Sequence, residues 1–321
     1  MKNFFIIFVI VMLALTSLPT KSEEKKGYSG MVHIEKDIYL AVKDNKNSNI
    51  PKYNQHGPRV TIIRITAGKD PHHESVEVDD WKDNDGVPSD LEAVCSIPGR
   101  PYEFLLAESG FFDNKFGRIF HVQLAQQNQS WRLKVLGVMR IYKRALDNRS
   151  RTVKANEVEG VSCFRDAENR LILVYAERGG LIGNSQQVGR ILWGEFDLNK
   201  YEFKQSGDEA LVSSSVLNDR DCSDLFIQVG NESHLVWSVA TIDAGDNGPF
   251  RSVIFRAGTF IFDHATNTLQ FKREPRPIIH WQLDGLKVEA LAAPTPVVPR
   301  SGFSIGTDDE CYGGIWRPLF E

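Results

Sequence analysis

Five residues with oxygen-bearing side chains recur along the chain, one in each of five related segments. They follow one another at nearly equal intervals of about 65 residues. Carboxylate and hydroxyl oxygens, with no Cys or His at the same positions, suit hard cations such as Ca²⁺, which accepts six to eight oxygen ligands. If the fold brings these residues together, we expect them to form a calcium site. The five are Ser29, Glu92, Glu159, Ser223 and Glu289.

The three carboxylates of this set need a partner if they meet. Without one they would repel each other, which raises pKa values and costs stability. A bound cation removes this conflict, and waters complete its ligand shell. The alternative is a group of carboxylates that accept hydrogen bonds from backbone N–H groups and from water.

The segments around these residues predict strands. A second apolar run follows shortly after each segment start, at 38–42, 104–107, 171–175, 235–239 and 303–306. In four copies a third run follows, at 59–63, 117–122, 189–193 and 251–255. Weaker fourth runs, such as 75–78, complete a unit of about 65 residues. Four antiparallel strands make one blade of a β-propeller.

The sequence therefore predicts an all-β protein, a five-bladed β-propeller with four-stranded antiparallel blades. The last copy runs only from 289 to 321, so the last blade is expected to be short, and how it closes the ring stays open. A helix is the competing local interpretation of 91–94 and 288–293, but five copies leading into strands favour an inner strand. Because inner strands line the central channel, the five oxygen-bearing residues should converge on its axis. We call them the axial residues.

A second set of charged residues should lie at the same end of the channel. Acidic residues end the second strands and arginines open the third strands. Arginines could bind an anionic substrate through charge-assisted hydrogen bonds, while a cation polarises a phosphoryl oxygen or lowers the pKa of bound water. In the alternative interpretation, each arginine pairs with a carboxylate of its own or a neighbouring blade. The substrate-binding candidates are Arg59, Arg118, Arg190, Arg251, Asp44, Glu108, Glu177 and Asp308.

Several short motifs carry a family resemblance over nearly all of the chain after residue 22. They are Ser29-Gly30, Asp90-Leu91-Glu92-Ala93-Val94, Asn156-Glu157-Val158-Glu159-Gly160-Val161, Ser223-Asp224-Leu225 and Val288-Glu289-Ala290-Leu291 before Gly306-Thr307-Asp308-Asp309. Their order and spacing resemble the esterase-like phytase family. The Ser, Glu, Glu, Ser, Glu order also resembles the axial calcium site of the calcium-activated nucleotidases (apyrases). Both resemblances imply a calcium-bearing propeller that acts on phosphate esters. The chain departs from the pattern in having Ala after Glu92 and Glu289.

The first residues are typical of a targeting signal. Lys2 precedes an apolar stretch, 4–18, which is too short to span a bilayer. We expect a signal peptide at 1–22, a single propeller domain at 23–321, and a secreted or periplasmic protein without a membrane span after cleavage. A retained N-terminal anchor is the alternative.

Composition limits the partners. The chain has 321 residues, with 38 Lys and Arg against 42 Asp and Glu, so it lacks the basic excess that a phosphate backbone requires. We expect no nucleic-acid partner, and the oligomeric state stays open. In an oxidising compartment the four cysteines allow three pairings, and four buried thiols are the alternative. The cysteines are Cys95, Cys163, Cys222 and Cys311.

Two functional hypotheses remain. In the first, the protein is an exported, calcium-dependent phosphoric ester hydrolase that acts on a small phosphorylated substrate. In the second, it is a non-catalytic binding propeller with a structural calcium ion that recognises a protein or a glycan. A propeller fold alone supports either hypothesis.

Overall fold

The computed structural model describes most of the chain after the predicted signal peptide, which lies outside the described residues. Within the described part, strands and turns are joined by one 3₁₀ helix, η2 (Glu310–Tyr312). The described residues are 27–46, 57–81, 86–110, 116–128, 130–140, 157–182, 185–211, 217, 220–242, 244–245 and 247–320.

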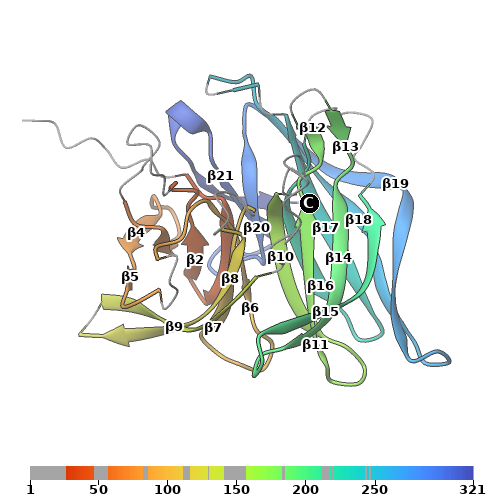
Figure 1. Cartoon of the computed structure of the whole chain (residues 1–321). Coiled ribbons are helices and arrows are strands. Elements are labelled where there is room, and N and C mark those ends of the chain that lie inside the picture. The colour runs from red at the N-terminus through yellow and green to blue at the C-terminus, as the bar shows by residue number, and fades with distance from the viewer. Residues whose placement is uncertain are drawn as a thin grey trace, which may run out of the picture.

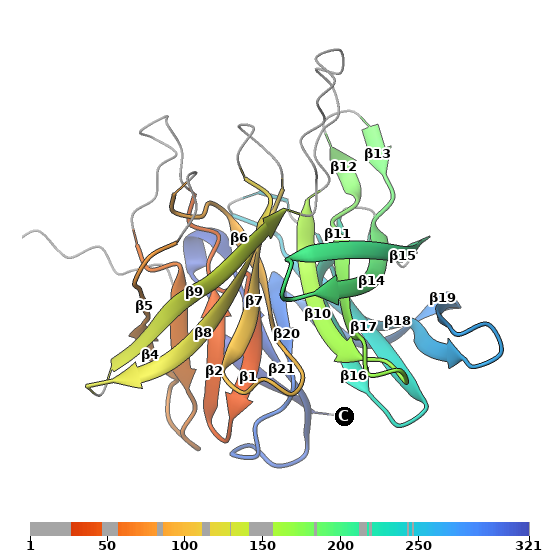
Figure 2. The same cartoon turned by 60° about the horizontal axis from the view of Figure 1, so that its bottom comes forward.

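Five antiparallel blades surround a central axis (Figures 1 and 2), which confirms the predicted fold. Blade 1 contains β1 (Gly30–Glu35), β2 (Ile38–Val42), β3 (Val60–Arg64) and β4 (His72–Ser75). Blade 2 contains β6 (Leu91–Ser96), β7 (Glu103–Glu108), β8 (Arg118–Gln127) and β9 (Ser130–Arg140). Blade 3 contains β10 (Val158–Arg165), β11 (Leu171–Glu177), β14 (Arg190–Asp197) and β15 (Glu202–Ala210). Blade 4 contains β16 (Arg220–Val229), β17 (Ser233–Ile242), β18 (Arg251–Asp263) and β19 (Thr268–Asp284). Blade 5 contains β20 (Val288–Ala292), β21 (Ser301–Thr307) and β22 (Trp316–Phe320).

The connection between blades 1 and 2 corrects one strand prediction. The expected fourth strand at 75–78 is divided, because β4 ends at Ser75 and β5 (Glu77–Val78) pairs in parallel with β9 of blade 2. Val76, between the two strands, is buried. A residue buried at the blade junction allows the chain to leave one sheet edge and join the next.

Blade 3 carries an additional hairpin. β12 (Gly180–Ile182) pairs with β13 (Ser185–Gln187), and the hairpin extends beyond the ends of β10 and β11 (Figures 1 and 2). The hairpin follows directly after the end of β11, which pairs with the start of β10. It therefore projects from the end of the channel where the inner strand β10 begins.

The apolar core lies between neighbouring blades. The second strands β2 and β11 are covered on both faces and are buried along their whole length. One cluster of this core joins β6 and β7 to β10 and β11 across the junction of blades 2 and 3. The inner strands are therefore held at fixed positions around the channel.

Two tyrosines of blade 1 join it to the short fifth blade. The backbone N–H of Tyr28 donates to the carbonyl of Thr307 at 3.1 Å. Tyr39 donates from its hydroxyl to the carbonyl of Ala293 at 3.1 Å and lies 2.8 Å from the hydroxyl of Ser304. Among the described residues, blade 5 has three strands, so contacts between blades 1 and 5 close the ring.

Candidate functional site

The three axial glutamates occupy the same structural position in their blades. The neighbours of Glu92 in β6 pair with two consecutive residues of β7, Glu108 and Ala107, so Glu92 is an extra residue in the strand. The same register shift surrounds Glu159 in β10 and Glu289 in β20. A β-bulge of this kind re-aims a side chain. The register thus establishes the equivalence of these three residues.

The two axial serines differ in their hydrogen bonds. Ser223 donates from its hydroxyl to the carbonyl of Val288 at 2.8 Å and lies 2.9 Å from the hydroxyl of Thr241. The hydroxyl of Ser29 is buried and has no hydrogen-bond partner among the described residues. Ser29 therefore offers a buried oxygen that can still accept a hydrogen bond or bind a cation.

Glycines after the axial residues permit close contact between inner strands. A Cβ atom on Gly30 would lie 2.8 Å from the Cα of Ala93 in blade 2. A Cβ atom on Gly160 would lie 2.6 Å from both Cβ and N of Leu225 in blade 4. Gly30 and Gly160 thus allow the axial residues of neighbouring blades to approach the same axis.

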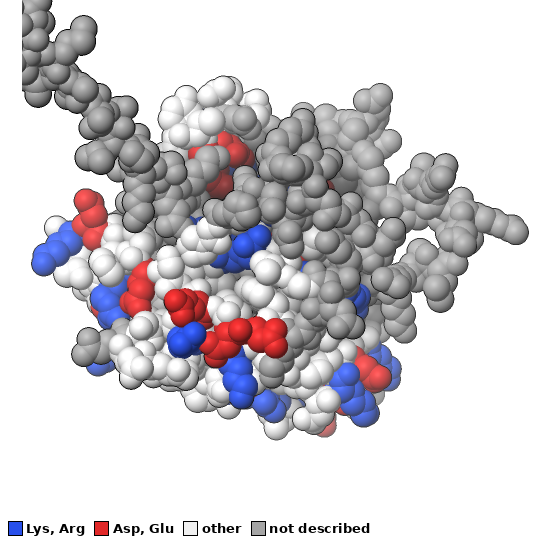
Figure 3. All heavy atoms as spheres, turned by 60° about the vertical axis from the view of Figure 1, so that its left-hand side comes forward, with Lys and Arg blue, Asp and Glu red and all other residues white. Residues whose placement is uncertain are grey.

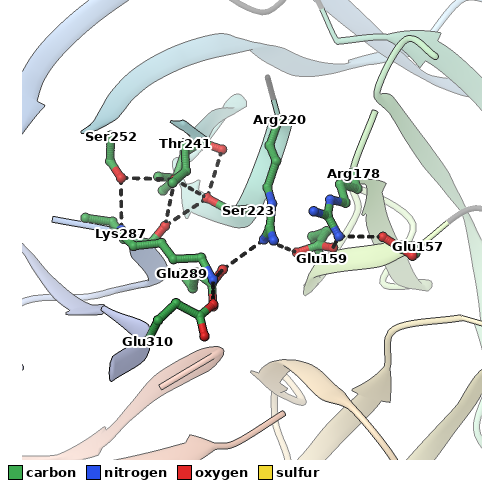
Figure 4. Close-up of polar contacts among 12 residues, drawn as sticks. Glu157, Glu159, Arg178, Arg220, Ser223, Thr241, Ser252, Lys287, Glu289 and Glu310 are labelled. Atoms are coloured by element: carbon green, nitrogen blue, oxygen red, sulfur yellow. Dashed lines mark hydrogen bonds and ion pairs between the residues drawn. The ribbon is translucent and has the colours of Figure 1, made fainter. Parts of the chain in front are cut away.

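Two cationic side chains pair with carboxylates of the acidic group (Figure 4), by which we mean the axial residues Glu92, Glu159 and Glu289. Arg220 donates from Nη1 to Oε1 of Glu289 at 2.9 Å and lies 3.9 Å from Oε2 of Glu159. Lys287 places Nζ 3.0 Å from Oε1 of Glu289 and also pairs with Glu310. Neither alternative considered from the sequence included such pairing with the chain's own cations.

A further arginine completes this side of the site. Arg178 donates from Nη1 to Oε2 of Glu157 at 2.7 Å and lies 3.9 Å from Oε1 of Glu159. Glu159 is therefore flanked by Arg178 and Arg220 (Figure 4). The one sequence signal that could have pointed to Arg178 is its place directly after Glu177, the acidic residue that ends β11.

Two of the axial glutamates, Glu92 and Glu159, have raised pKa values. Burial, followed by repulsion from Glu159, holds the pKa of Glu92 well above its usual range. Burial raises the pKa of Glu159 to about 7, although Arg220 and Arg178 oppose the shift. The cause in each case is a negative charge that is removed from water next to other negative charges.

Two aspartates that were not among the predicted metal ligands interact electrostatically with the axial glutamates. Burial raises the pKa of Asp90 to about 7, and the ammonium of Lys46, 3.7 Å away, opposes the shift. Burial and repulsion from Glu289 raise the pKa of Asp308 to about 7. One buried carboxylate oxygen of Asp90 and one of Asp308 accept no hydrogen bond from the part of the chain that the structure describes. Asp308 was predicted as a substrate-binding candidate rather than as a member of the axial group.

The donor chemistry fits a hard cation, although the side chains do not form a closed coordination group. Within the described residues, no three Asp, Glu, His or Cys side chains are arranged as a metal site. Among the described residues near the channel, oxygens of Ser29, Asp90 and Asp308 accept no hydrogen bond, and that of Asp90 lies 3.7 Å from Nζ of Lys46. All are hard oxygen donors, the type that Ca²⁺ selects over softer ligands.

Arg118 and Glu108 form a buried pair inside blade 2. Arg118 is fully buried and donates from Nε to Oε2 of Glu108 at 3.0 Å and from Nη2 to Oε1 at 2.6 Å. Glu108 also accepts the backbone N–H of Ser89 at 2.9 Å. These contacts connect the start of β8 to the loop before β6.

The other candidate arginines also contact their own or a neighbouring blade. Arg190 pairs with Asp208 of β15, and Arg251 pairs with Asp284 of β19. Arg59 donates from Nε to the carbonyl of Pro88 at 2.7 Å. The pairing alternative describes the contacts of Arg190 and Arg251, whereas Arg59 contacts a backbone carbonyl rather than a carboxylate.

The two remaining acidic candidates, Asp44 and Glu177, have different surroundings. Asp44 contributes to the raised pKa values of Asp90, Glu92 and Asp308, so it belongs to the acidic side of the channel. Glu177 is buried at the end of β11.

The outer surface has mixed charge. On the face in Figure 3, acidic and basic side chains of the described residues lie next to one another. None of these described residues belongs to an apolar helix of the length that a bilayer crossing requires.

Fold and site together define a five-bladed β-propeller with a buried charged group at one end of its channel. No protein-family model matches the chain, and no curated protein matches it. A crystal structure of a GH43_12 retrieved from capybara gut metagenome is similar, with a TM-score of 0.41 and 13% identity over 78% of this chain. This chain spans 42% of the length of that structure. The Cps50 (Swd1) β-propeller domain of Myceliophteria thermophila gives a TM-score of 0.33 and 10% identity, over 92% of this chain and 86% of that one. TM-scores this low carry no argument about activity.

Proposed function

We propose that the protein is an exported calcium-binding β-propeller of the phytase-like type that hydrolyses phosphate esters at the channel end where the inner strands begin. The main support is the repeated bulge that directs Glu92, Glu159 and Glu289 to one axis. Buried carboxylates that share a site without enough cations attract either protons or a metal ion.

The axial residues would hold the calcium ion. Arg220 contacts Glu159 and Glu289. The buried hydroxyl of Ser29, which has no hydrogen-bond partner among the described residues, supports its role as a ligand. Glu159 and Glu289 would share their charge between the ion and Arg220. Ser223 donates its proton to a backbone carbonyl, and its oxygen lone pairs remain able to bind a cation.

Two cationic side chains could bind the phosphoryl group. Arg178 is held by Glu157 and Lys46 by Asp90, and their side chains are 29% and 52% exposed. An arginine can bind two phosphoryl oxygens at once, whereas a lysine provides a point charge. When bound, calcium would polarise a phosphoryl oxygen and lower the pKa of a bound water.

Hydrolysis of a panel of nucleotides, phytate and nitrophenyl phosphates, in calcium and in chelator, tests the enzymatic role. We expect turnover that requires calcium and is lost in Glu92→Gln. A matched control is Arg273→Ala, which removes an exposed pair with Glu209 of β15 and should leave turnover unchanged. Turnover at background with every substrate would overturn the enzymatic role.

A second function is supported by the pairing of the predicted substrate arginines. Since Arg118, Arg190 and Arg251 each bind a carboxylate of their own blade, the propeller could instead recognise a protein or a glycan with calcium as a structural ion. In that case Glu159→Gln lowers calcium uptake and melting temperature but changes no activity.

Calcium itself is tested separately from activity. A ligand that binds only the folded state stabilises it. Chelation of calcium should therefore lower the melting temperature whether the protein is a hydrolase or a binding propeller. Metal analysis of the purified protein should find calcium. An unchanged melting curve together with the absence of bound metal would contradict both functions.

A further inference from the structure

Two cysteines face each other across the junction of blades 2 and 3. The Sγ atoms of Cys95 in β6 and Cys163 in β10 are 3.6 Å apart. Both residues are buried in the apolar cluster that joins these blades. The two sulfurs are thus in contact although the cysteines belong to different blades and lie far apart in the chain.

The other two cysteines have different surroundings. The buried thiol of Cys222 donates to the carbonyl of Asp224 at 3.4 Å and accepts from the hydroxyl of Ser238 at 3.5 Å. Cys311 is exposed in η2. Of the three pairings that four cysteines allow, only one joins two thiols that already touch.

We propose that Cys95 and Cys163 form a disulfide that links the inner strands of blades 2 and 3. A disulfide bond is about 2.0 Å long, and sulfurs in contact need only small side-chain rotations to reach it. Cys222 and Cys311 then stay reduced. This pairing does not depend on what the channel binds.

The chemistry requires a disulfide oxidant, such as oxidised glutathione or the disulfide of a thiol oxidoreductase. One cysteine, as its thiolate, attacks the oxidant, forms a mixed disulfide and releases one reduced thiol. The second cysteine attacks the protein sulfur of this mixed disulfide and releases the other thiol. Two protein thiols are oxidised, one oxidant disulfide is reduced, and the two protons pass to the released thiolates.

Burial determines when this exchange is fast. Desolvation raises the pKa of Cys95 well above its usual range, so its reactive thiolate is scarce in the folded protein. The bond should therefore form while blades 2 and 3 are still assembling. Once formed, it should resist reductants until the protein unfolds.

The disulfide would lie close to the axial residues. Cys95 follows Glu92 by three residues, and Cys163 follows Glu159 by four. A cross-link here fixes the separation of the two strands that carry these carboxylates. It also closes a long loop, which restricts the unfolded chain and raises stability.

Peptide mapping tests the pairing directly. Trypsin, which cleaves after Lys and Arg except before Pro, places each cysteine in its own peptide, at 83–115, 155–165, 221–251 and 301–321. The full-length chain is refolded in a glutathione redox buffer, and free thiols are alkylated under denaturing conditions before digestion. We expect peptide 83–115 linked to 155–165, with the other two alkylated. Four alkylated cysteines, or a linkage to either other peptide, would overturn the proposal.

Matched variants separate the disulfide from simple loss of a buried side chain. Oxidative refolding should raise the melting temperature of wild type and of Cys222→Ala by several degrees relative to the reduced forms. Cys95→Ala should show no such rise. If Cys95→Ala does not fold, the linkage map of the wild type still decides the question. An equal rise in Cys95→Ala would contradict the proposal.

Discussion

Arg220 in blade 4 donates a hydrogen bond from Nη1 to Oε1 of Glu289 in blade 5, at a distance of 2.9 Å. The same nitrogen lies 3.9 Å from Oε2 of Glu159 in blade 3. One guanidinium thus interacts with carboxylates of both neighbouring blades.

Removing this guanidinium should strongly destabilise the ring. Arg220→Ala leaves Glu159 and Glu289 buried with fewer compensating charges, and breaking a buried pair from one side costs about 3 to 5 kcal/mol. Urea denaturation measures the free energy of unfolding. The control Arg251→Ala breaks an exposed pair of the same blade and should change stability by less than about 1 kcal/mol. Equal effects of the two variants would refute a central role for Arg220.

The two axial serines should respond oppositely to the same substitution. In chelator, Ser29→Ala should be neutral or slightly stabilising, because it removes a buried hydroxyl that makes no hydrogen bond. Ser223→Ala should cost about 1 kcal/mol, because it removes the hydrogen bond from this hydroxyl to the carbonyl of Val288, which still accepts from the hydroxyl of Thr241.

Calcium binding gives the second measurement on these variants. Calorimetric titration should show a weaker calcium affinity in Ser29→Ala than in wild type, because an oxygen ligand is lost. A Ser29→Ala protein that is destabilised in chelator but binds calcium normally would contradict this role of the hydroxyl.

Protonation of the acidic group should make stability depend on pH. The pKa of Asp308 is about 7 in the folded protein and near 4 when unfolded, so the folded state holds the proton more tightly. Its contribution to stability is full below about pH 4 and is lost as the pH rises through 7. The free energy of unfolding of Asp308→Asn, relative to that of wild type, should therefore rise by on the order of 2 kcal/mol from pH 5 to pH 8.

Denaturation in chelator at the two pH values measures this difference. Calcium should reduce it, because a bound cation also relieves the repulsion between carboxylates. An Asp308→Asn effect that is the same at pH 5 and pH 8 would contradict the raised pKa.

The close contact of blades 3 and 4 should make Gly160 intolerant of a side chain. A Cβ atom there would lie 2.6 Å from two atoms of Leu225, and such overpacking costs about 1 to 3 kcal/mol. At Gly306 the nearest atoms are at 3.0 and 3.1 Å and belong to side chains, so Gly306→Ala should cost less. Thermal melting of both variants checks the order. A Gly160→Ala protein as stable as wild type would show that the strands can separate without cost.

The number of blades could be predicted because each blade is a local unit. Short apolar runs, such as the continuous run of β2, mark the buried strands within each unit of about 65 residues. The repeat also placed the axial residues in register, since Glu92, Glu159 and Glu289 each start an equivalent inner strand. The bulge that directs these side chains to the axis has no comparable sequence signal, because a one-residue insertion depends on pairing with the next strand.

Export, calcium and phosphoester hydrolysis stay predictions, whereas the charge pairing at the channel emerged only from the structure. Arg220 and Glu289 are 69 residues apart, and nothing in their local sequences relates them. The division of 75–78 between two blades likewise depends on the neighbouring edge strand β9.

The sequence alone thus determined the strand pattern, the blade count and the equivalence of Glu92, Glu159 and Glu289, because these depend on local periodicity. Only the tertiary structure decided which charges are neutralised and which cysteines touch. Such contacts join different blades, as Cys95 and Cys163 do, and their distances exist only once the ring has closed.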